Sequence, residues 1–132
     1  MAAVRVLIVD DSLTIRAMLE QVLGRERDIV LVGTARDADS AMRMVREHRP
    51  DVTTIDIAMP GTDGLALLDA VRAKTNAVML SNRSEAADES FARGALGFFD
   101  KPRILSDSKR LVRMVHAAAA GKRSRRPAAP AI

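Results

Sequence analysis

The chain has 132 residues, no cysteine and a formal net charge of +4. This length suits one domain with a substantial core, and the lack of cysteine excludes disulfides, thiolate metal ligands and cysteine nucleophiles. No run of about 18 apolar residues is present, so we expect no membrane span. The early charges of MAAVRVLIVDD argue against a signal peptide. We therefore expect a cytoplasmic protein.

The excess of positive charge lies in the last twelve residues, GKRSRRPAAPAI. Four Lys and Arg residues and no acid occur there, and the remaining 17 basic residues equal the 17 acidic ones. This Pro- and Ala-rich segment, residues 121–132, is typical of a disordered tail or a linker, which leaves residues 1–120 as the domain. The domain is neutral and has neither zinc-finger spacing nor an aromatic strand for stacking bases, which argues against nucleic-acid binding.

Strands and helices alternate from the N-terminus onward. Val4 to Val9 is a continuous apolar run, typical of a strand that is buried on both faces. A helix follows, for which Ser12 can serve as the N-cap and Gly24 as the end. The pattern then predicts a strand at Ile29 to Val32 and an amphipathic helix from Ala38 to His48.

The second half of the chain continues this alternation. Strands are predicted at Val52 to Ile55, Ala77 to Leu80 and Phe98 to Phe99, and helices at Leu65 to Val71, about Glu85 to Arg93 and about Ser106 to Ala120. Such an order predicts a doubly wound α/β fold, with a five-stranded parallel sheet and helices on both faces. Ligands of open parallel sheets bind beyond the carboxyl ends of the strands.

Charged and polar side chains follow four of the predicted strands. Asp10 and Asp11 follow the first strand, Asp56 ends the third, Ser81 ends the fourth and Lys101 comes just after the fifth. The carboxyl ends of parallel strands share one edge, so three acids, a hydroxyl and an ammonium group are expected to meet there. Carboxylates about 4 Å apart repel by roughly 4 kcal/mol per pair at an effective dielectric near 20. The cluster therefore favours a bound cation, and an all-oxygen site suits Mg²⁺.

Each of these residues also has an ordinary interpretation when it is taken alone. Asp10 could cap the next helix, Ser81 could be a turn hydroxyl, and Lys101 could be a surface lysine. Their joint placement favours a site in which Asp56 is a nucleophile toward phosphorus. A metal would neutralise the negative charge there, and Lys101 with Ser81 would bind phosphoryl oxygens.

The segments VLIVDDS, DVTTIDIAMPGTDGL, VMLS and GALGFFDKP carry a family resemblance. In this order and near this spacing, the chain resembles the receiver domain of bacterial two-component response regulators over about Val4 to Ala118. The runs DDSLTIRAML and TTIDIAMPGTDGL are closest to chemotaxis receivers, particularly those of chemoreceptor methylesterases. The resemblance implies a flavodoxin-like sheet.

The resemblance also implies roles for the acidic residues. Asp56 would accept a phosphoryl group from a phosphohistidine on a histidine kinase or a histidine phosphotransferase. Asp11 would bind Mg²⁺ directly and Asp10 mainly through water. Asp56 itself and the backbone carbonyl of Ala58 would supply further ligands to the metal.

The remaining family positions concern the switch. Lys101 would pair with phosphoryl oxygens, and its bond to Pro102 is expected to be cis. Ser81 would move toward the phosphoryl group, and Phe98 takes the place of the family's rotating aromatic residue, although it lacks a hydroxyl. The face of the fourth helix, fifth strand and fifth helix would bind an unidentified downstream protein. The chain would be a monomer or a phosphorylation-dependent dimer.

Three functional hypotheses follow. The first is a stand-alone receiver, a switch that is no enzyme beyond slow catalysis of its own phosphorylation and dephosphorylation. The second is the N-terminal regulatory receiver of a larger enzyme, such as a chemoreceptor methylesterase, with a linker that begins at Gly121. The third is a small phosphohydrolase that uses an aspartyl-phosphate, which typically needs a second acid where Ala58 stands.

Overall fold

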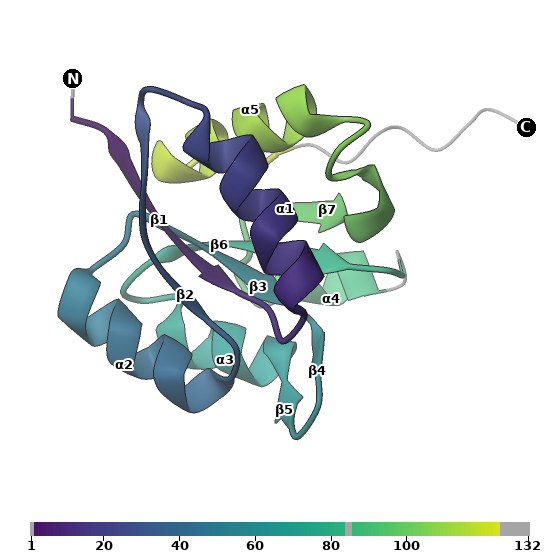
Figure 1. The fold of residues 1–132 in the computed structure, drawn as a ribbon. Coiled ribbons are helices and arrows are strands. Elements are labelled where there is room, and N and C mark those ends of the chain that lie inside the picture. The colour runs from purple at the N-terminus through teal and green to yellow at the C-terminus, as the bar shows by residue number, and fades with distance from the viewer. Residues whose placement is uncertain (1, 84–85, 125–132) are drawn as a thin grey trace, which may run out of the picture.

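A five-stranded parallel sheet forms the centre of the molecule (Figure 1). The computed structural model describes residues 2–83 and 86–124. The strands lie in the order β2-β1-β3-β6-β7, and every neighbouring pair is parallel. Their bounds are β1 (Val4–Val9), β2 (Ile29–Ala35), β3 (Val52–Asp56), β6 (Asn76–Ser81) and β7 (Gly97–Asp100). The predicted doubly wound sheet is confirmed.

Helices cover both faces of the sheet (Figure 1). The helices α1 (Leu13–Gly24) and α5 (Ser108–Ala119) pack on one face, and α2 (Ala38–His48) and α3 (Gly64–Val71) pack on the other. The short helix α4 (Ala87–Ala92) contacts β7. Helix α4 is shorter than the predicted helix, whose first residue, Glu85, lies outside the described residues.

Strand β1 shows why the sequence has an unbroken apolar run there. Val6 and Ile8 lie in the core beneath α1 and α5, whereas Leu7 and Val9 lie in the core beneath α2 and α3. All four side chains are fully buried. A strand that serves two cores cannot alternate between apolar and polar residues.

Strand β2 extends beyond its predicted end at Val32. Its pairing with β1 continues past a register shift, with Leu7 opposite Gly33 and Val9 opposite Ala35. The Gly-Thr-Ala end of this strand has little apolar character, so its strand structure comes from pairing with β1 rather than from its own propensity.

A small hairpin that the sequence pattern did not predict follows β3. Strands β4 (Ala58–Met59) and β5 (Thr62–Asp63) pair in antiparallel fashion, and Gly61 adopts a φ of 71° between them. Strands of two residues are too short to show a periodic pattern. The hairpin leads into α3, because the Asp63 carboxylate caps the helix by accepting a hydrogen bond of 2.9 Å from the Leu65 amide.

Gly64, the first residue of α3, allows the helix to approach the end of β3 closely. A Cβ atom at this position would lie 2.3 Å from the Asp56 carbonyl oxygen and 2.5 Å from the Ile57 Cα. The Gly64 amide donates to the Ile57 carbonyl at 2.9 Å. The second glycine of the MPGTDG run is therefore needed to hold α3 against the chain around Asp56.

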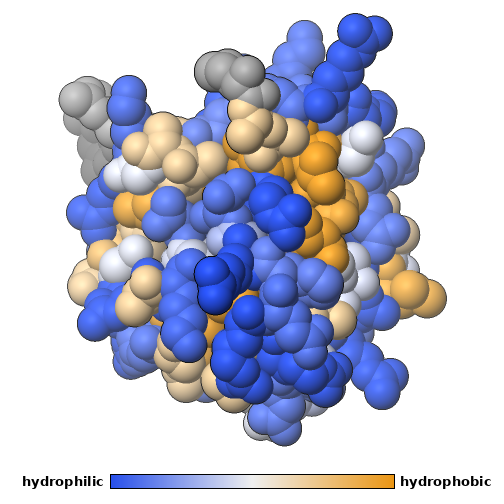
Figure 2. Space-filling model, turned by 90° about the vertical axis from the view of Figure 1, so that its left-hand side faces the viewer, coloured by the Kyte–Doolittle hydropathy of each residue, from blue (hydrophilic) through white to orange (hydrophobic). Residues whose placement is uncertain are grey.

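The surface seen from the side of β2 and α2 is mainly hydrophilic, with apolar side chains between the polar ones (Figure 2). Among the described residues, the exposed large hydrophobic side chains are Leu13, Val30 and Leu105. No helix within 2–83 or 86–124 combines the length and the apolarity required to cross a bilayer.

The first residues after α5 remain close to the domain. Gly121 adopts a φ of 74°, and the Lys122 amide donates to the Ala117 carbonyl at 2.8 Å, which closes the end of the helix. The Ser124 amide donates to the Leu96 carbonyl at 2.8 Å. The sequence predicted a disordered tail over residues 121–132. Residues 125–132 of this segment lie outside the described residues.

Candidate functional site

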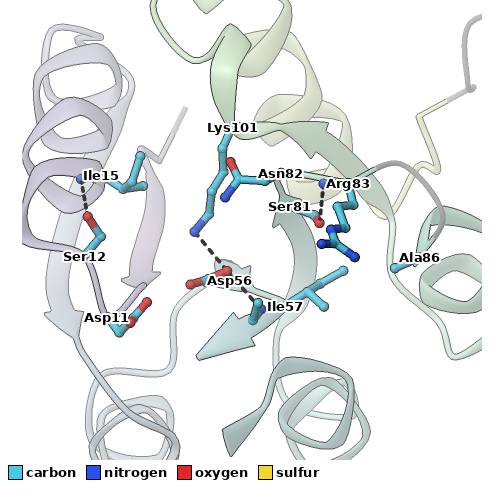
Figure 3. Close-up of a pocket in the computed structure, with 11 residues that line it drawn as sticks. Asp11, Ser12, Ile15, Asp56, Ile57, Ser81, Asn82, Arg83, Ala86 and Lys101 are labelled. Carbon is cyan, nitrogen blue, oxygen red and sulfur yellow. Dashed lines mark hydrogen bonds and ion pairs between the residues drawn. The ribbon is translucent and has the colours of Figure 1, made fainter. Parts of the chain in front are cut away.

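The carboxyl ends of four strands enclose a pocket of about 740 Å³ (Figure 3). Residues that follow β1, β3, β6 and β7 contribute to its wall. The lining residues are Asp11, Ser12, Ile15, Asp56, Ile57, Ala58, Ser81, Asn82, Arg83, Ala86 and Lys101. The sequence correctly predicted that Asp11, Asp56, Ser81 and Lys101 meet at one edge of the sheet.

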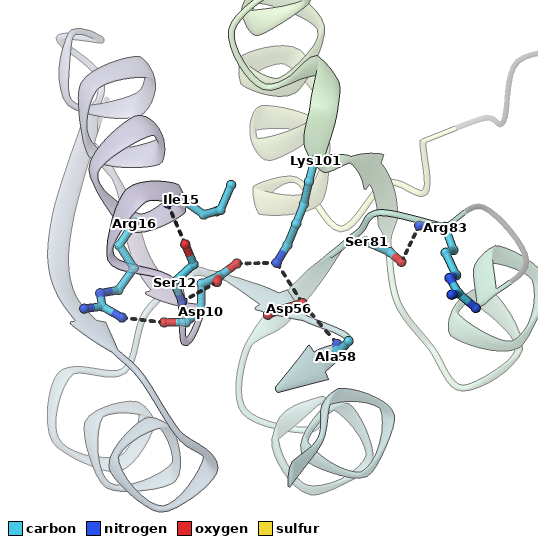
Figure 4. A network of polar contacts seen from close by, with 9 residues as sticks. All are labelled: Asp10, Ser12, Ile15, Arg16, Asp56, Ala58, Ser81, Arg83 and Lys101. Carbon is cyan, nitrogen blue, oxygen red and sulfur yellow. Dashed lines mark hydrogen bonds and ion pairs between the residues drawn. The ribbon is translucent and has the colours of Figure 1, made fainter. Parts of the chain in front are cut away.

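Lys101 joins two buried carboxylates at the centre of the site (Figure 4). Its Nζ lies 2.9 Å from Asp10 Oδ2 and 2.9 Å from Asp56 Oδ1. Asp10 and Asp56 are almost fully buried, and Lys101 is only 7% exposed. Charges in such a place are stable only when they are paired, so the three residues form one electrostatic unit.

Backbone groups fix the two carboxylates further. The Ala58 amide donates to Asp56 Oδ1 at 3.0 Å, and the Ser12 amide donates to Asp10 Oδ1 at 2.9 Å. Ser12 also accepts a hydrogen bond from the Ile15 amide and caps α1, as its sequence position predicted. The Asp10 side chain therefore supports the turn into α1 and also belongs to the charged site.

The surroundings of Asp56 raise the pKa of its carboxyl group above that of an exposed aspartate. Burial raises the pKa of Asp56 from 3.8 to about 6, and the nearby Asp10 and Asp11 carboxyls add to the rise while Lys101 opposes it. Burial alone would lower the pKa of Lys101, but its contacts with Asp10 and Asp56 outweigh burial and raise it. A further positive charge in the pocket would thus stabilise Asp56 as a carboxylate.

The acidic residues fit a divalent cation. One carboxylate oxygen from each of Asp10, Asp11 and Asp56 lies within 4.8 Å of the other two. Within the described part of the chain, Asp56 Oδ2 is buried and has no hydrogen-bond partner, and Asp10 Oδ2 has only its ion pair with Lys101. Hard oxygen donors with unused lone pairs suit Mg²⁺.

Ser81 and Phe98 lie on neighbouring strands beside the site. Ser81 is buried, and its hydroxyl accepts a hydrogen bond of 3.0 Å from the Arg83 amide. Phe98 is partly buried and packs against the core beneath α2 and α3, and it lies opposite Met79 in the parallel register. The serine therefore connects the end of β6 to the chain that leads toward α4.

The Lys101–Pro102 peptide bond corrects one expectation from the family resemblance. The expected cis bond was wrong, because the described residues contain no cis peptide bond. Pro102 is the central residue of a short 3-10 helix, Lys101–Arg103, which is closed by a hydrogen bond from the Ile104 amide to the Lys101 carbonyl at 3.1 Å. The fixed φ of proline suits the first turn of such a helix.

Sequence reasoning did not place Ile15, Ile57 or Ala86 at the pocket. Ile15 lies in the first turn of α1 and lines the pocket (Figure 3). Its place in the first turn after the N-cap Ser12 could have revealed this position, because the helix that follows a parallel strand begins at the carboxyl edge of the sheet. Ala86 carries no chemical signal in the sequence.

A family model described as the response regulator receiver domain matches residues 6–116. Among curated relatives, a protein-glutamate methylesterase/protein-glutamine glutaminase of Shewanella sp. strain MR-4 is 40% identical, with 98% of this chain and 40% of that protein covered. A protein of the same description from Pseudomonas aeruginosa is 38% identical over 76% of this chain and 31% of its own. The chain thus spans two fifths or less of these relatives.

Solved structures agree with the family model. The response regulator domain of Thermotoga maritima CheB superposes with a TM-score of 0.83 and 29% identity, covering 89% of this chain and 97% of that one. The receiver domain of a NarL regulator from Mycobacterium tuberculosis gives a TM-score of 0.82 and 31% identity, covering 92% of this chain and 100% of that one. The resemblance inferred from the sequence motifs is confirmed, and the chain belongs to the receiver domain family of response regulators.

Proposed function

We propose that Asp56 accepts a phosphoryl group from a phosphohistidine on a histidine kinase or a histidine phosphotransferase. The observation that carries this proposal is that one oxygen of the Asp56 carboxylate is held in place while the other is left without a partner among the described residues. Oδ1 is held by Lys101 and by the Ala58 amide, whereas the buried Oδ2 has no hydrogen-bond partner in the described chain. A fixed carboxylate that borders an open pocket is suited to nucleophilic attack.

In the transfer, a carboxylate oxygen of Asp56 forms a bond to phosphorus. The bond from phosphorus to the imidazole nitrogen breaks, and its electron pair stays on the imidazole. Lys101, already within 2.9 Å of Asp56, would remain as a cationic partner for the phosphoryl oxygens. Asp10 would keep the lysine in place through the second ion pair.

Asp10, Asp11 and Asp56 would hold Mg²⁺, together with the backbone carbonyl of Ala58. When bound, this cation supplies positive charge that offsets the repulsion between the carboxylates and the incoming phosphoryl group. The closeness of the three carboxylates and the lack of a partner for Asp56 Oδ2 support this assignment. Asp10 would act mainly through water, because its oxygens already contact Ser12 and Lys101.

The phosphoryl group would be read out through Ser81 and Phe98. A move of the Ser81 hydroxyl toward a phosphoryl oxygen would form a charge-assisted hydrogen bond in place of its contact with the Arg83 amide. Phe98, only partly buried, would then rotate toward the space beside Ser81. We define the output face as α4, β7 and α5, the surface on which a downstream protein would bind.

Incubation with acetyl phosphate and Mg²⁺ followed by intact-mass measurement tests the assignment of Asp56. Wild type and Asp39→Asn, which changes an exposed acid on α2, should both gain one phosphoryl group. Asp56→Asn should gain none. An adduct of equal yield in Asp56→Asn would refute the assignment.

A second candidate function is the regulatory receiver of a larger methylesterase-type enzyme. It is supported by the relatives, which are described as protein-glutamate methylesterases and are more than twice as long as the part that this chain matches. Sequencing the gene beyond the codon for Ile132 tests it. A continuous reading frame into a domain that bears a G-x-S-x-G motif would support this function, and an immediate stop codon would exclude it.

A further inference from the structure

The residues Lys122–Ser124, here called the strap, cross from the end of α5 to α4 and the start of β7. The guanidinium carbon of Arg123 lies 4.6 Å from the centroid of the Phe91 ring on α4. The Ser124 amide donates to the Leu96 carbonyl, one residue before β7. The strap therefore touches the output face at two points that are independent of each other, one a cation–π contact and the other a backbone hydrogen bond.

Gly121 makes this path possible. Its φ of 74° turns the chain out of α5, and the hydrogen bond from the Lys122 amide to Ala117 fixes the direction in which the chain leaves. The end of α5 is itself anchored to β6, because the Asn76 side-chain amide donates to the Ala118 carbonyl at 2.7 Å. The strap thus begins at the end of a helix that is hydrogen-bonded to the sheet and contacts α4, a helix with few contacts to the rest of the domain.

Helix α4 has few interior contacts. It contains six residues, of which Ala87 and Ser90 are buried, and within the described residues no side chain caps its N-terminus. Contacts with α3 hold its C-terminal end, where Arg93 pairs with Asp69 at 3.0 Å and the Arg93 carbonyl accepts a hydrogen bond of 2.6 Å from Arg72. The strap supplies a contact on Phe91, and a helix held in this way changes position at low cost.

We propose that the strap is docked on the output face while Asp56 is unmodified and that phosphorylation of Asp56 loosens it. This coupling rests on the proposed function, because it requires a phosphoryl group that draws Ser81 inward. The Ser81 hydroxyl accepts a hydrogen bond from the Arg83 amide. Its move to the phosphoryl group breaks this bond, so the chain that leads to α4 is released and can shift. Phe91 moves with α4, while Arg123 stays with α5.

Two consequences follow from this arrangement. A protein that binds at Phe91 or Leu96 has to displace the strap, so docking of the strap reduces the affinity of the output face. By linkage, a change that releases the strap also favours the phosphorylated conformation to the same extent. The residues just after the domain are thus a regulatory part of the switch, in contrast to the disordered tail or linker that their composition suggests.

Proton NMR of the Arg123 side chain tests docking directly. An arginine stacked over an aromatic ring has its Hδ protons shifted upfield by the ring current. In unmodified wild-type protein we expect this shift at Arg123, and we expect Phe91→Leu to abolish it. The second stacked arginine, Arg110 over Phe99 at 5.3 Å, serves as an internal control that Phe91→Leu leaves unchanged. A random-coil shift for Arg123 in the wild type would overturn the proposal.

Beryllofluoride with Mg²⁺, a stable mimic of the phosphoryl group, then tests the coupling. We expect most of the upfield shift of Arg123 to disappear while the Ala58 and Ser81 amides also shift. A response of Ala58 and Ser81 with Arg123 unchanged would overturn the coupling and leave the proposed function intact. No response at Ala58 or Ser81 would contradict the proposed function, and the coupling would fall with it.

A matched pair of arginine substitutions tests the coupling in the opposite direction, from the strap to the phosphorylation site. Arg123→Ala should raise the affinity for beryllofluoride, because the released strap no longer favours the unmodified conformation. Arg113→Ala removes the same charge from an exposed position on α5 with no ring contact or ion pair in the described structure, and it should match wild type. Equal affinities in the two variants would contradict the linkage.

Discussion

Helices α3 and α4 each follow a strand that ends at the site, but they are held in different ways. Helix α3 buries Leu65, Leu67, Leu68 and Val71 and is capped by Asp63. Helix α4 buries Ala87 and Ser90, and no side chain caps it in the part of the chain that the structure describes. The chain around Asp56 therefore rests on a helix that is part of the core, whereas the chain after Ser81 leads to one held by surface contacts. A switch requires this combination of a rigid acceptor and an adjacent element of low local stability.

The largest effect is expected where α3 meets β3. Gly64→Ala would place a Cβ 2.3 Å from the Asp56 carbonyl oxygen, and its next neighbours are also backbone atoms, of Ile57, which cannot move aside as a side chain can. We expect a loss of about 3 kcal/mol or more in the free energy of unfolding, measured by urea denaturation. Gly24→Ala is the control, because its nearest neighbour would be a side-chain atom at 3.6 Å. Equal stabilities of the two variants would show that α3 does not rest on this contact.

The next largest effect on the free energy of unfolding is expected from the buried charge of Asp56. The pKa of Asp56 is about 6 in the folded protein, so the folded state binds a proton more readily than the unfolded chain. Protonation of Asp56 therefore stabilises the folded state. This stabilisation is complete below the ordinary pKa of 3.8 and is lost as the pH rises through about 6, the pKa in the folded protein. In EDTA at about pH 8, Asp56→Asn should therefore exceed wild type by roughly 1 to 3 kcal/mol.

Urea denaturation at several pH values checks this prediction. The advantage of Asp56→Asn should shrink as pH falls toward 3.8, because wild-type Asp56 then becomes neutral as well. Asp39→Asn on the exposed side of α2 controls for the change in net charge. An advantage that is the same at every pH would show that desolvation of the Asp56 charge is not its cause.

Strand ends and buried runs account for most of what the sequence predicted. Asp11, Asp56, Ser81 and Lys101 were placed correctly because the ends of parallel strands must share one edge. The hairpin at Ala58–Asp63 was missed because two-residue strands have no period, and its geometry depends on pairing rather than on propensity.

Other features depend on contacts between distant segments. The need for glycine at position 64 comes from its approach to Asp56, which no local pattern records. The strap was predicted as part of a disordered tail or a linker because it belongs to the basic, Pro- and Ala-rich segment 121–132. Its contacts with Phe91 and Leu96 arise only in the folded chain. The composition of a segment indicates how much apolar surface the segment can bury. It does not indicate which part of the folded domain will lie next to the segment.

On the α4 side, Ser81→Ala should change stability by only about 1 kcal/mol, because it removes one hydrogen bond to the Arg83 amide. Its effect on signalling should be larger than its effect on chemistry. We expect the variant to accept a phosphoryl group from acetyl phosphate, as mass measurement would show. The phosphate-dependent amide shifts in α4 should be mostly lost, and wild-type shifts in this variant would refute the role of Ser81.

The smallest effect on stability is expected at the tie between the two helices. Arg93→Ala removes two surface ion pairs, one with Asp69 of α3 and one with Glu89 of α4. Surface pairs contribute little, so the loss should be only about 1 kcal/mol in total. Hydrogen exchange should nevertheless become faster at the amides of α4 and remain unchanged in α3. Faster exchange in both helices would mean that α4 is not separately held.

Backbone amide spectra recorded before and after addition of Mg²⁺ and beryllofluoride test the central claim most directly. The contrast between the two helices predicts large shifts at Ser81, in α4 and in β7, with little change over Leu67–Val71 of α3, and no such pattern in Asp56→Asn. Shifts of equal size in α3 and α4, or the same pattern in Asp56→Asn, would contradict a rigid acceptor that drives a weakly held helix.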